Sequence, residues 1–268
     1  MIVSKVTNNE KQAILEFCKN TFSWGDYIDD VWDSWINEGN FLVIHHEDMP
    51  VAICHAAIFK GKQVWIEGIR VHESFRRKGI ASKLVGESEN LGKQNDCTTS
   101  FMLIESNNKK SLDLAQKLNY ENFETWNFYY LEPKKTNSIL EIKFANYECK
   151  IPSIIFSPNF YYVDSWRWMP LDDATRLSLI NQKRIIFFEN NDSSCVAIFS
   201  DSKHFEKTLL VTVFSEKTDG LNHIFSYLQN FGYTNNYKRV QILTKLNLSQ
   251  DFVGLQYRLK FHLMKKKI

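Results

Sequence analysis

The segment from Trp65 to Leu84 constrains the fold of this chain more than any other stretch of its sequence. Its first seven residues are mostly β-branched or aromatic and predict a buried strand, and from Ala81 onward the apolar spacing predicts a helix. A cationic turn with a single glycine joins the two elements. Such a turn aims several backbone N–H groups and the positive end of a helix dipole at one point in space. The segment therefore predicts an anion-binding site.

The charge of this turn favours a pyrophosphate over a lone phosphate. Arg76, Arg77 and Lys78 crowd the turn, while Gly79 lets the backbone approach a ligand closely. The phosphate motifs Gly-x-x-x-x-Gly-Lys-Ser/Thr and Gly-x-Gly-x-x-Gly do not occur in the chain. Residues 76–81 instead match the pattern Arg/Gln-x-x-Gly-x-Gly/Ala, and in this the segment resembles the GNAT acetyltransferases.

The predicted order of elements extends this resemblance over the first half of the chain. Hydrophobic patterns predict a strand, two helices, three antiparallel strands, a helix, a strand, a helix and a strand, as in the GNAT fold. The resemblance implies an α/β (α+β) domain in which helices flank a mixed central sheet. The predicted ranges are 2–6, 10–22, 28–35, 41–46, 51–58, 65–71, a helix from 81, 98–104, 108–118 and 124–131.

The second half of the chain partly repeats this pattern. Polar residues 133–138 break the periodicity and predict a linker between domains at 1–133 and 139–268. The second domain is expected to be a degenerate GNAT-like half, because the mixed-charge residues 215–221 replace the basic turn. One cofactor site per chain is therefore expected. The predicted strands are 184–188, 195–199, 209–214, 239–244 and 259–264, and the predicted helices are 221–230 and 251–256.

Composition narrows the possible partners and the compartment. The net charge of +2 comes from 33 basic and 31 acidic residues that are well mixed, so we do not expect a nucleic acid partner. Five scattered cysteines without a Cys-x-x-Cys pair favour reduced thiols and no metal site. No leader precedes residues 2–6 and no stretch approaches eighteen apolar residues. The sequence predicts a cytoplasmic protein that does not enter a membrane.

The resemblance implies acetyl-CoA (coenzyme A) as the cofactor and assigns its contacts. The pantetheine arm is expected to pair with backbone groups near Ile69 and Val71, and the turn at 76–81 to hold the pyrophosphate. Arg70 is expected to contact the cofactor or to form a surface salt bridge, and Asn108 to face the cofactor or to cap its helix. The predicted cofactor-binding residues are Ile69, Arg70, Val71, Arg76, Arg77, Lys78, Gly79, Ile80, Ala81, Ser82, Asn108 and Ser111.

Glu67 stands where these enzymes often carry the carboxylate that acts as general base. It lies among Trp, Ile and Gly residues, so burial is expected to raise its pKa towards neutral pH. The alternative is a carboxylate paired with Arg or His within the sheet. His55 and His72 are rival bases on chemistry alone, although each fits a structural or surface role better.

The helix after the next strand carries a second match and a departure from the family pattern. Its residues 108–120 resemble the family's Asn-x-x-Ala-x-x-x-Tyr-x-x-x-Gly-Phe in spacing, but the tyrosine that usually protonates the leaving thiolate falls on Ala115. A thiolate leaves without strong protonation, because a thiol pKa is about 8.5. Activity therefore remains possible. The candidate replacements are Ser111, Tyr120, Tyr161 and Tyr162.

The acceptor is expected to bind beside the helices that precede the hairpin. Residues 22–35 mix aromatics with four aspartates, a mixture that can hold a cationic amine or can form an ordinary amphipathic helix. Arg167 could pair with a substrate carboxylate. This stretch loosely resembles the histidine N-acetyltransferase branch of the superfamily. The predicted substrate-binding residues are Trp24, Asp26, Tyr27 and Arg167.

The sequence therefore predicts an acetyl-CoA-dependent N-acetyltransferase of tandem GNAT type that acts on a small amine or amino acid. One alternative is acetylation of a protein N-terminus or lysine. Another is a non-catalytic acyl-CoA-binding regulatory protein, which Ala115 allows. A monomer and a homodimer are both compatible with the sequence.

Overall fold

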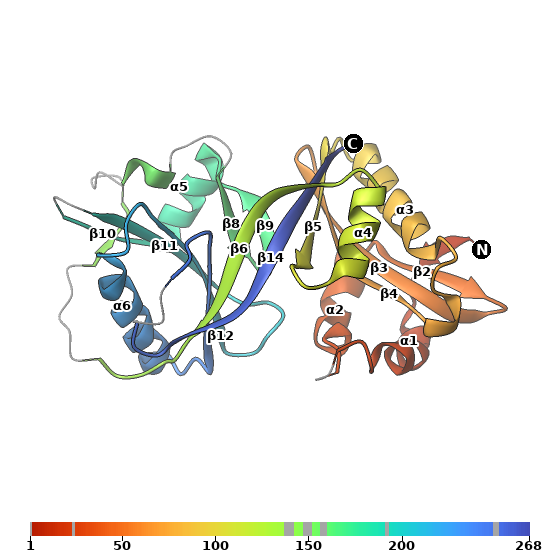
Figure 1. Ribbon diagram of the computed structural model, residues 1–268, viewed down its shortest axis with the longest axis horizontal. Coiled ribbons are helices and arrows are strands. Elements are labelled where there is room, and N and C mark those ends of the chain that lie inside the picture. Colours follow the sequence, from red (N-terminus) through yellow and green to blue (C-terminus); the bar gives the residue numbers. More distant parts are fainter. Residues whose placement is uncertain are drawn as a thin grey trace. The chain divides into compact units, whose positions relative to one another are not determined.

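The structure is a computed structural model that describes residues 2–22, 25–136, 142–146, 152–155, 160–190, 193–248 and 252–268. The chain forms two compact units (Figure 1). Unit 1 comprises Met1–Glu124 together with His262–Ile268, and unit 2 comprises Thr125–Phe261. These bounds differ from the expected division at 133–138 in two ways. Unit 2 begins earlier, and the last residues of the chain belong to unit 1.

Unit 1 has the expected order of elements up to its last strands. The sheet begins with the strand order β1-β2-β3-β4-β5, in which β1 to β4 pair antiparallel and β4 pairs parallel with β5. The elements are β1 Val3–Lys5, η1 Asn8–Glu10, α1 Lys11–Cys18, α2 Ile28–Glu38, β2 Phe41–His46, β3 Met49–Phe59, β4 Gln63–Val71, η2 Glu73–Phe75, α3 Ile80–Gln94, β5 Thr99–Glu105, α4 Lys109–Lys117 and β6 Glu121–Leu131.

Side chains on the two faces of this sheet enter two separate hydrophobic clusters, because successive strand residues point to opposite faces. On β2, Phe41 and Val43 pack with α1 and α2, while Leu42 and Ile44 pack with α3 and α4. The mixed sheet of unit 1 is therefore covered by helices on both sides, as the sequence predicts for the GNAT fold (Figure 1).

The hairpin between β2 and β3 is tighter than the sequence suggests. Glu47 and Asp48 both have positive φ, +49° and +65°, which is the conformation of a two-residue hairpin turn. Strand β3 therefore begins at Met49 instead of residue 51, and Pro50 lies opposite His45.

The C-terminal strand β14, Leu255–Lys267, is longer than expected, and its last residues complete unit 1. The Ile268 N–H donates to the Thr98 carbonyl, and Lys266 Nζ bonds both carboxylate oxygens of Glu89 at 2.8 and 2.9 Å. The short helix expected at 251–256 is wrong over its described residues. Residues 252–254 form a turn in which Gly254 has φ +82°, and the strand follows directly.

The described residues of unit 2 form a run of paired strands, a separate two-stranded antiparallel sheet of β8 and β9, and the long helix α6. Its neighbouring strands follow the order β6-β13-β12-β11-β10-β7, with β12 and β13 parallel and the other pairs antiparallel. Apolar residues of α6 pack on these strands. The elements are β7 Lys143–Phe144, η3 Ser153–Ile155, β8 Tyr161–Asp164, β9 Arg167–Pro170, α5 Asp173–Asn181, β10 Ile185–Glu189, β11 Ser194–Asp201, β12 Thr208–Ser215, α6 Leu221–Thr234 and β13 Arg239–Thr244.

Among the described residues, no helix has the length and apolar character needed to cross a membrane.

Candidate active site

A bulge in β4 positions Glu67. Strand pairing runs from His55 opposite Glu67 to Ile53 opposite Arg70, so two residues of β4 lie opposite one residue of β3. Gly68 lies in this bulge with φ +64°, and a Cβ added to it would lie 2.3 Å from the Trp35 ring. Only glycine fits both the backbone conformation and the space. The bulge therefore turns the strand at the residue that follows the candidate base.

Beyond the bulge, β4 and β5 are no longer paired. Their parallel ladder covers only residues 63–65 and 99–101, although both strands continue past it. The His72 N–H donates to Val51 on β3. By the alternation of an antiparallel ladder, the backbone groups of Ile69 and Val71 point away from β3, towards the side that β5 leaves open. These are the two residues predicted to pair with the pantetheine arm.

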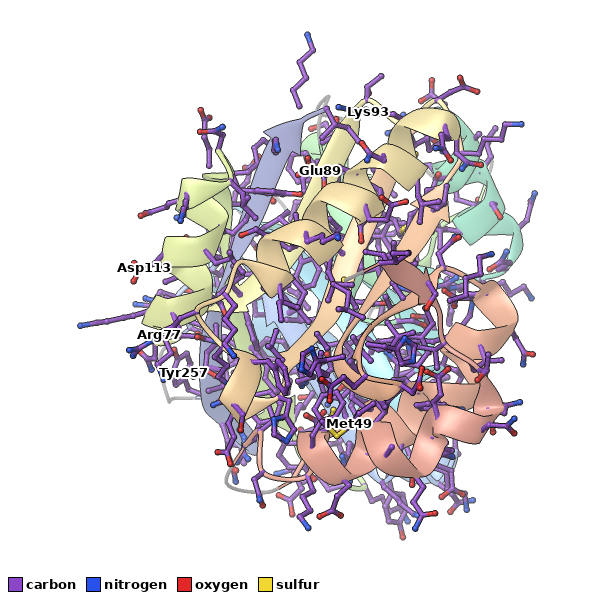
Figure 2. All side chains as sticks on the ribbon, turned by 90° about the vertical axis from the view of Figure 1, so that its right-hand side faces the viewer. Met49, Arg77, Glu89, Lys93, Asp113 and Tyr257 are labelled. Atoms are coloured by element: carbon purple, nitrogen blue, oxygen red, sulfur yellow. The ribbon has the colours of Figure 1, made fainter. Side chains whose placement is uncertain are left out.

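The basic turn has the geometry of an anion site. After η2, Arg76 is extended, Arg77 has φ +62° and Gly79 has φ +78°. The first backbone hydrogen bond of α3 runs from the Lys83 N–H to the Gly79 carbonyl, so the ladder of the helix does not use the N–H groups that precede Lys83. Residues 76–79 are exposed, and Figure 2 shows Arg77 at the start of α3, which carries Glu89 and Lys93 further along.

Two arginines near the turn bond neighbouring carbonyls. Arg76 Nε donates to the Val71 carbonyl at 3.0 Å, and Arg70 Nη1 donates to the Ile69 carbonyl at 3.2 Å. Each carbonyl oxygen has a second lone pair, so these bonds leave room for a further donor. At the start of α3, Ile80 is buried in the core while Ala81 and Ser82 are half-buried.

At the start of α4, Asn108 caps the helix, which is one of the two roles expected for it. The Asn108 side-chain oxygen accepts a hydrogen bond from the Ser111 backbone N–H at 3.2 Å, as a helix-capping residue does. Ala115 is fully buried. Tyr120 donates to Glu89 Oε1 at 2.9 Å and bonds the Ser100 hydroxyl, and burial raises the pKa of Tyr120 above its ordinary value. Tyr120 is therefore part of the core.

Glu67 is paired within the sheet, as the structural alternative predicts. Glu67 Oε1 lies 2.9 Å from His55 Nδ1, and the Trp65 indole N–H donates to Oε2 at 3.1 Å. The His55 side chain is fully buried, whereas 12% of the Glu67 side chain remains exposed. The carboxylate is thus fixed from two directions and still reaches the surface of unit 1.

Arg70 forms a buried ion pair in place of the surface salt bridge considered above. Arg70 Nε and Nη2 donate to the two oxygens of Asp26 at 2.6 and 3.0 Å. The guanidinium also lies over the rings of Phe22 and Tyr27, at 5.1 and 5.2 Å. The Asp26 carboxylate therefore pairs with Arg70 inside unit 1. Burial raises the pKa of Tyr27, so its phenol stays neutral.

The other two predicted substrate residues, Trp24 and Arg167, do not belong to the described part of unit 1. Trp24 lies outside the described residues. Arg167 is a buried residue at the start of β9 in unit 2. In the same unit Tyr161 and Tyr162 are buried on β8, and burial raises the pKa of Tyr162 to about 12.

The sequence analysis considered a pairing of Glu67 with Arg or His in the sheet but did not name His55 as the partner, although a signal for it exists. The β3–β4 hairpin pairs Phe59 with Gln63 around a short turn. Counting outward from that turn, one residue on each strand at a time, places His55 opposite Glu67. A register derived from the turn would therefore have predicted the pair.

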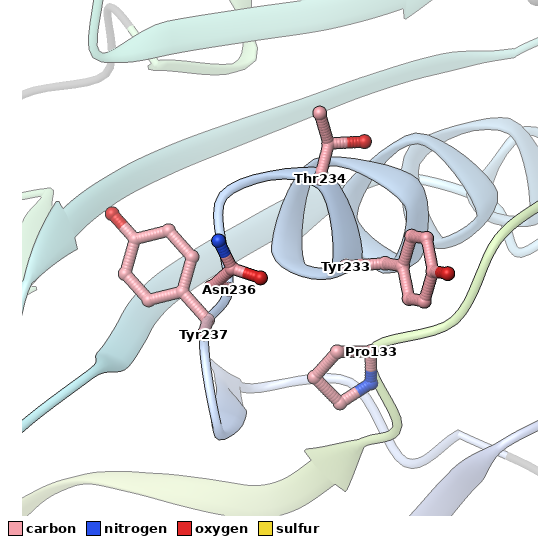
Figure 3. A pocket seen from close by; sticks show the side chains of 5 residues that line it. All are labelled: Pro133, Tyr233, Thr234, Asn236 and Tyr237. Atoms are coloured by element: carbon pink, nitrogen blue, oxygen red, sulfur yellow. The ribbon is translucent and has the colours of Figure 1, made fainter.

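Unit 2 contains a hollow in its surface. The hollow has a volume of about 530 Å³, and its lining residues, labelled in Figure 3, are Pro133, Tyr233, Thr234, Asn236 and Tyr237. Its lining contains no charged side chain. Within the described part of the chain, no group of three or more His, Cys, Asp or Glu side chains could hold a metal ion.

Comparison with known proteins agrees with this geometry. Residues 11–120 match the family model described as Acetyltransferase (GNAT) family. Among solved structures, the GCN5-related N-acetyltransferase from Sphaerobacter thermophilus has a TM-score of 0.67 at 12% identity, with 99% of this chain and 95% of that chain covered. A tandem GNAT protein from the clavulanic acid biosynthesis pathway has a TM-score of 0.56 at 9% identity, with coverages of 99% and 98%. No curated protein matches the chain. The segment 11–120 thus matches the GNAT acetyltransferase family, and the chain has the fold of that superfamily.

Proposed function

We propose that this protein is an acetyl-CoA-dependent N-acetyltransferase that acts on a small amine or amino acid. One observation carries the proposal. Strand β4 bears a fixed carboxylate at its bulge, leaves its pairing with β5 there, and continues into an exposed basic turn at the start of α3. This continuous segment thus offers backbone groups for the thioester arm, a basic turn for the pyrophosphate and a carboxylate base for the amine.

The residues of the turn fit the cofactor. The pyrophosphate would bind the backbone N–H groups before Lys83 together with Arg76, Arg77 and Lys78, and the pantetheine amides would bond Ile69 and Val71. A Cβ added to Gly79 would meet no atom within 4 Å, so the turn is open to a ligand. The bound thioester supplies an activated acetyl group.

Glu67 would take a proton from the acceptor ammonium, directly or through one water. The freed amine would then attack the thioester carbonyl, forming the N–C bond as the C–S bond breaks, and the second proton of the attacking nitrogen would pass through water to the leaving thiolate. Water would carry this proton because Ala115 offers no hydroxyl and Tyr120 is held in the core. Tyr27 and the Arg70–Asp26 pair would border the acceptor. The pairing of Arg167 with a substrate carboxylate stays a separate proposal.

Ala115 also favours a second candidate, a protein that binds acyl-CoA without catalysis, because the position of the usual acid is a buried methyl group. Acetylation of a peptide instead of a small amine is a third possibility with the same machinery.

We also propose that unit 2 is a degenerate GNAT-like domain without a cofactor turn. The free, buried thiols of Cys18, Cys54, Cys97 and Cys195 support a reducing, cytoplasmic location.

The test is the substitution Glu67→Gln, with Glu73→Gln as a matched control from the exposed η2 turn. An enzyme should lose about two to four powers of ten in turnover with Glu67→Gln, while acetyl-CoA still raises its melting temperature. Glu73→Gln should change neither. Retained turnover in Glu67→Gln would remove the assigned base, and no melting shift of the wild type with acetyl-CoA would overturn the cofactor site.

A further inference from the structure

The hydrogen-bond partners of His55 determine how many protons its ring carries. Nδ1 lies 2.9 Å from Glu67 Oε1, and Nε2 lies 3.2 Å from the Gly39 carbonyl oxygen. A carbonyl only accepts, so Nε2 carries hydrogen. The contact at Nδ1 then requires one more proton, located either on the ring or on the carboxyl group of Glu67.

Three contacts favour the ring as the site of that proton. The Trp65 indole N–H donates to the other oxygen of Glu67, which stabilises the ionised carboxylate. Gly39 is the C-cap of α2, where the helix dipole favours a cation. Glu38 Oε2, on the same helix end, lies 3.7 Å from Nε2.

The surrounding side chains also accept a cationic ring. The Trp35 indole stacks on the imidazole at 4.7 Å between centroids and 6° between planes, and Phe41 meets its edge at 6.2 Å. Trp faces attract cations. On β3 itself the Cys54 thiol is neutral, because burial raises its pKa to about 12. Next to Glu67 on β4, the charge of Arg70 is matched by Asp26.

We infer that His55 is a positioning residue that remains a buried imidazolium and holds Glu67 ionised and in one orientation. The inference deepens the proposed function and rests on it for its catalytic consequence. It gives the candidate base a permanent cationic partner, so Glu67 stays ready to accept a proton well below neutral pH.

The direct test is nitrogen NMR of the full-length protein at about pH 8, where a free histidine with an ordinary pKa of about 6.5 is neutral. Both ring nitrogens of His55 should give the signature of a protonated imidazolium, with the assignment taken from the signals lost in His55→Gln. In Glu67→Gln one nitrogen should lose its proton. A neutral ring in the wild type at this pH would overturn the inference.

Steady-state kinetics provide a second test. His55→Gln keeps an N–H donor for Glu67 but removes the charge, so acetyl-CoA affinity should be unchanged while the acidic limb of kcat/KM moves up by about one pH unit or more. An unmoved limb would contradict the electrostatic role. If His55→Gln does not fold, the response of the ring to Glu67→Gln still decides the question. An imidazolium signature in a protein that transfers no acetyl group would overturn the proposed function and leave the ion pair intact.

Discussion

Both units contain a strand, a turn and a helix next to a parallel strand pair, yet only unit 1 leaves that turn open. In unit 1 the β4–β5 ladder stops after residues 63–65, and the glycine before α3 has empty space beside it. In unit 2 the β12–β13 ladder extends over residues 208–212. A Cβ on Gly220, the residue before α6, would lie within 2.9 Å of Cys195, Phe188 and Ser193.

The side chains around the start of α6 explain this difference. Phe188 stacks on His223 at 4.0 Å, and both lie where an anion would have to approach the first turn of the helix. The same local topology therefore serves binding in one unit and packing in the other. What separates them is the early end of a strand pairing and the charge of the turn residues, not the order of elements.

Charge reversal should have the largest effect, because it should weaken acetyl-CoA binding in the turn of unit 1 and not in the turn of unit 2. Arg76→Glu combined with Arg77→Glu should weaken acetyl-CoA binding by about 100-fold or more, since hydrogen bonds to charged groups contribute about 1.5–3 kcal/mol each. Lys217→Glu, in the turn before α6, is the matched control and should leave the Kd unchanged. Calorimetric titration measures both. Equal losses in the two variants would mean that the cofactor site is not confined to unit 1.

The second largest difference is expected between the ion pairs of the two units, in their contribution to the free energy of unfolding. Lys266→Met should lower the free energy of unfolding by about 3 kcal/mol, because it leaves the Glu89 carboxylate, 10% exposed, without its cation. Lys238→Met in unit 2 should cost nothing measurable, since Lys238 and Glu206 are 61% and 75% exposed. Urea unfolding compares the two, and a similar loss in both would show that the C-terminal pair does not stabilise unit 1.

The glycines before the two helices should give opposite patterns. Gly220→Ala should cost about 1–3 kcal/mol of stability through overpacking and leave acetyl-CoA affinity intact. Gly79→Ala should cost about 1 kcal/mol for its left-handed backbone and should also weaken binding. Melting curves with and without acetyl-CoA separate the two effects. If Gly220→Ala weakened acetyl-CoA binding and Gly79→Ala did not, the cofactor turn would have to be assigned to unit 2.

The last expected difference concerns stability at alkaline pH. Burial raises the pKa of both Cys18 and Cys54 to about 12, while the unfolded thiols keep their ordinary value of about 8.5. Their contribution is complete below the unfolded value and is lost as the pH rises towards 12. The variant with Cys18→Ala and Cys54→Ala should therefore lose less stability than the wild type between pH 8 and 10. Cys195→Ala should also lose less stability than the wild type, because burial raises the pKa of this unit 2 thiol as well. A double variant that loses as much stability as the wild type over this pH range would contradict the prediction.

Periodicity predicted the elements of unit 1 well, because one face of each strand and helix is apolar and the turns carry clear signals. It missed β8 and β9, since the aromatic run at 161–168 shows no clear alternation, and it also missed α5. The anion turn was visible because its charge and glycine are adjacent in sequence. The partners of Arg70 and Glu67 depend on a loop and on strand register, which local patterns do not specify. The allocation of residues 262–268 to unit 1 is non-local and leaves no trace in the sequence.

That allocation has a consequence for biosynthesis. The ribosome makes residues 262–268 after all of unit 2, so the nascent first unit lacks the strand end that bonds Thr98 and the lysine that neutralises Glu89. Domains generally fold as they emerge, N-terminal first. In this protein, unit 1 can reach its final state only after the ribosome has also made unit 2. Activity should therefore appear only when synthesis of the second unit is complete.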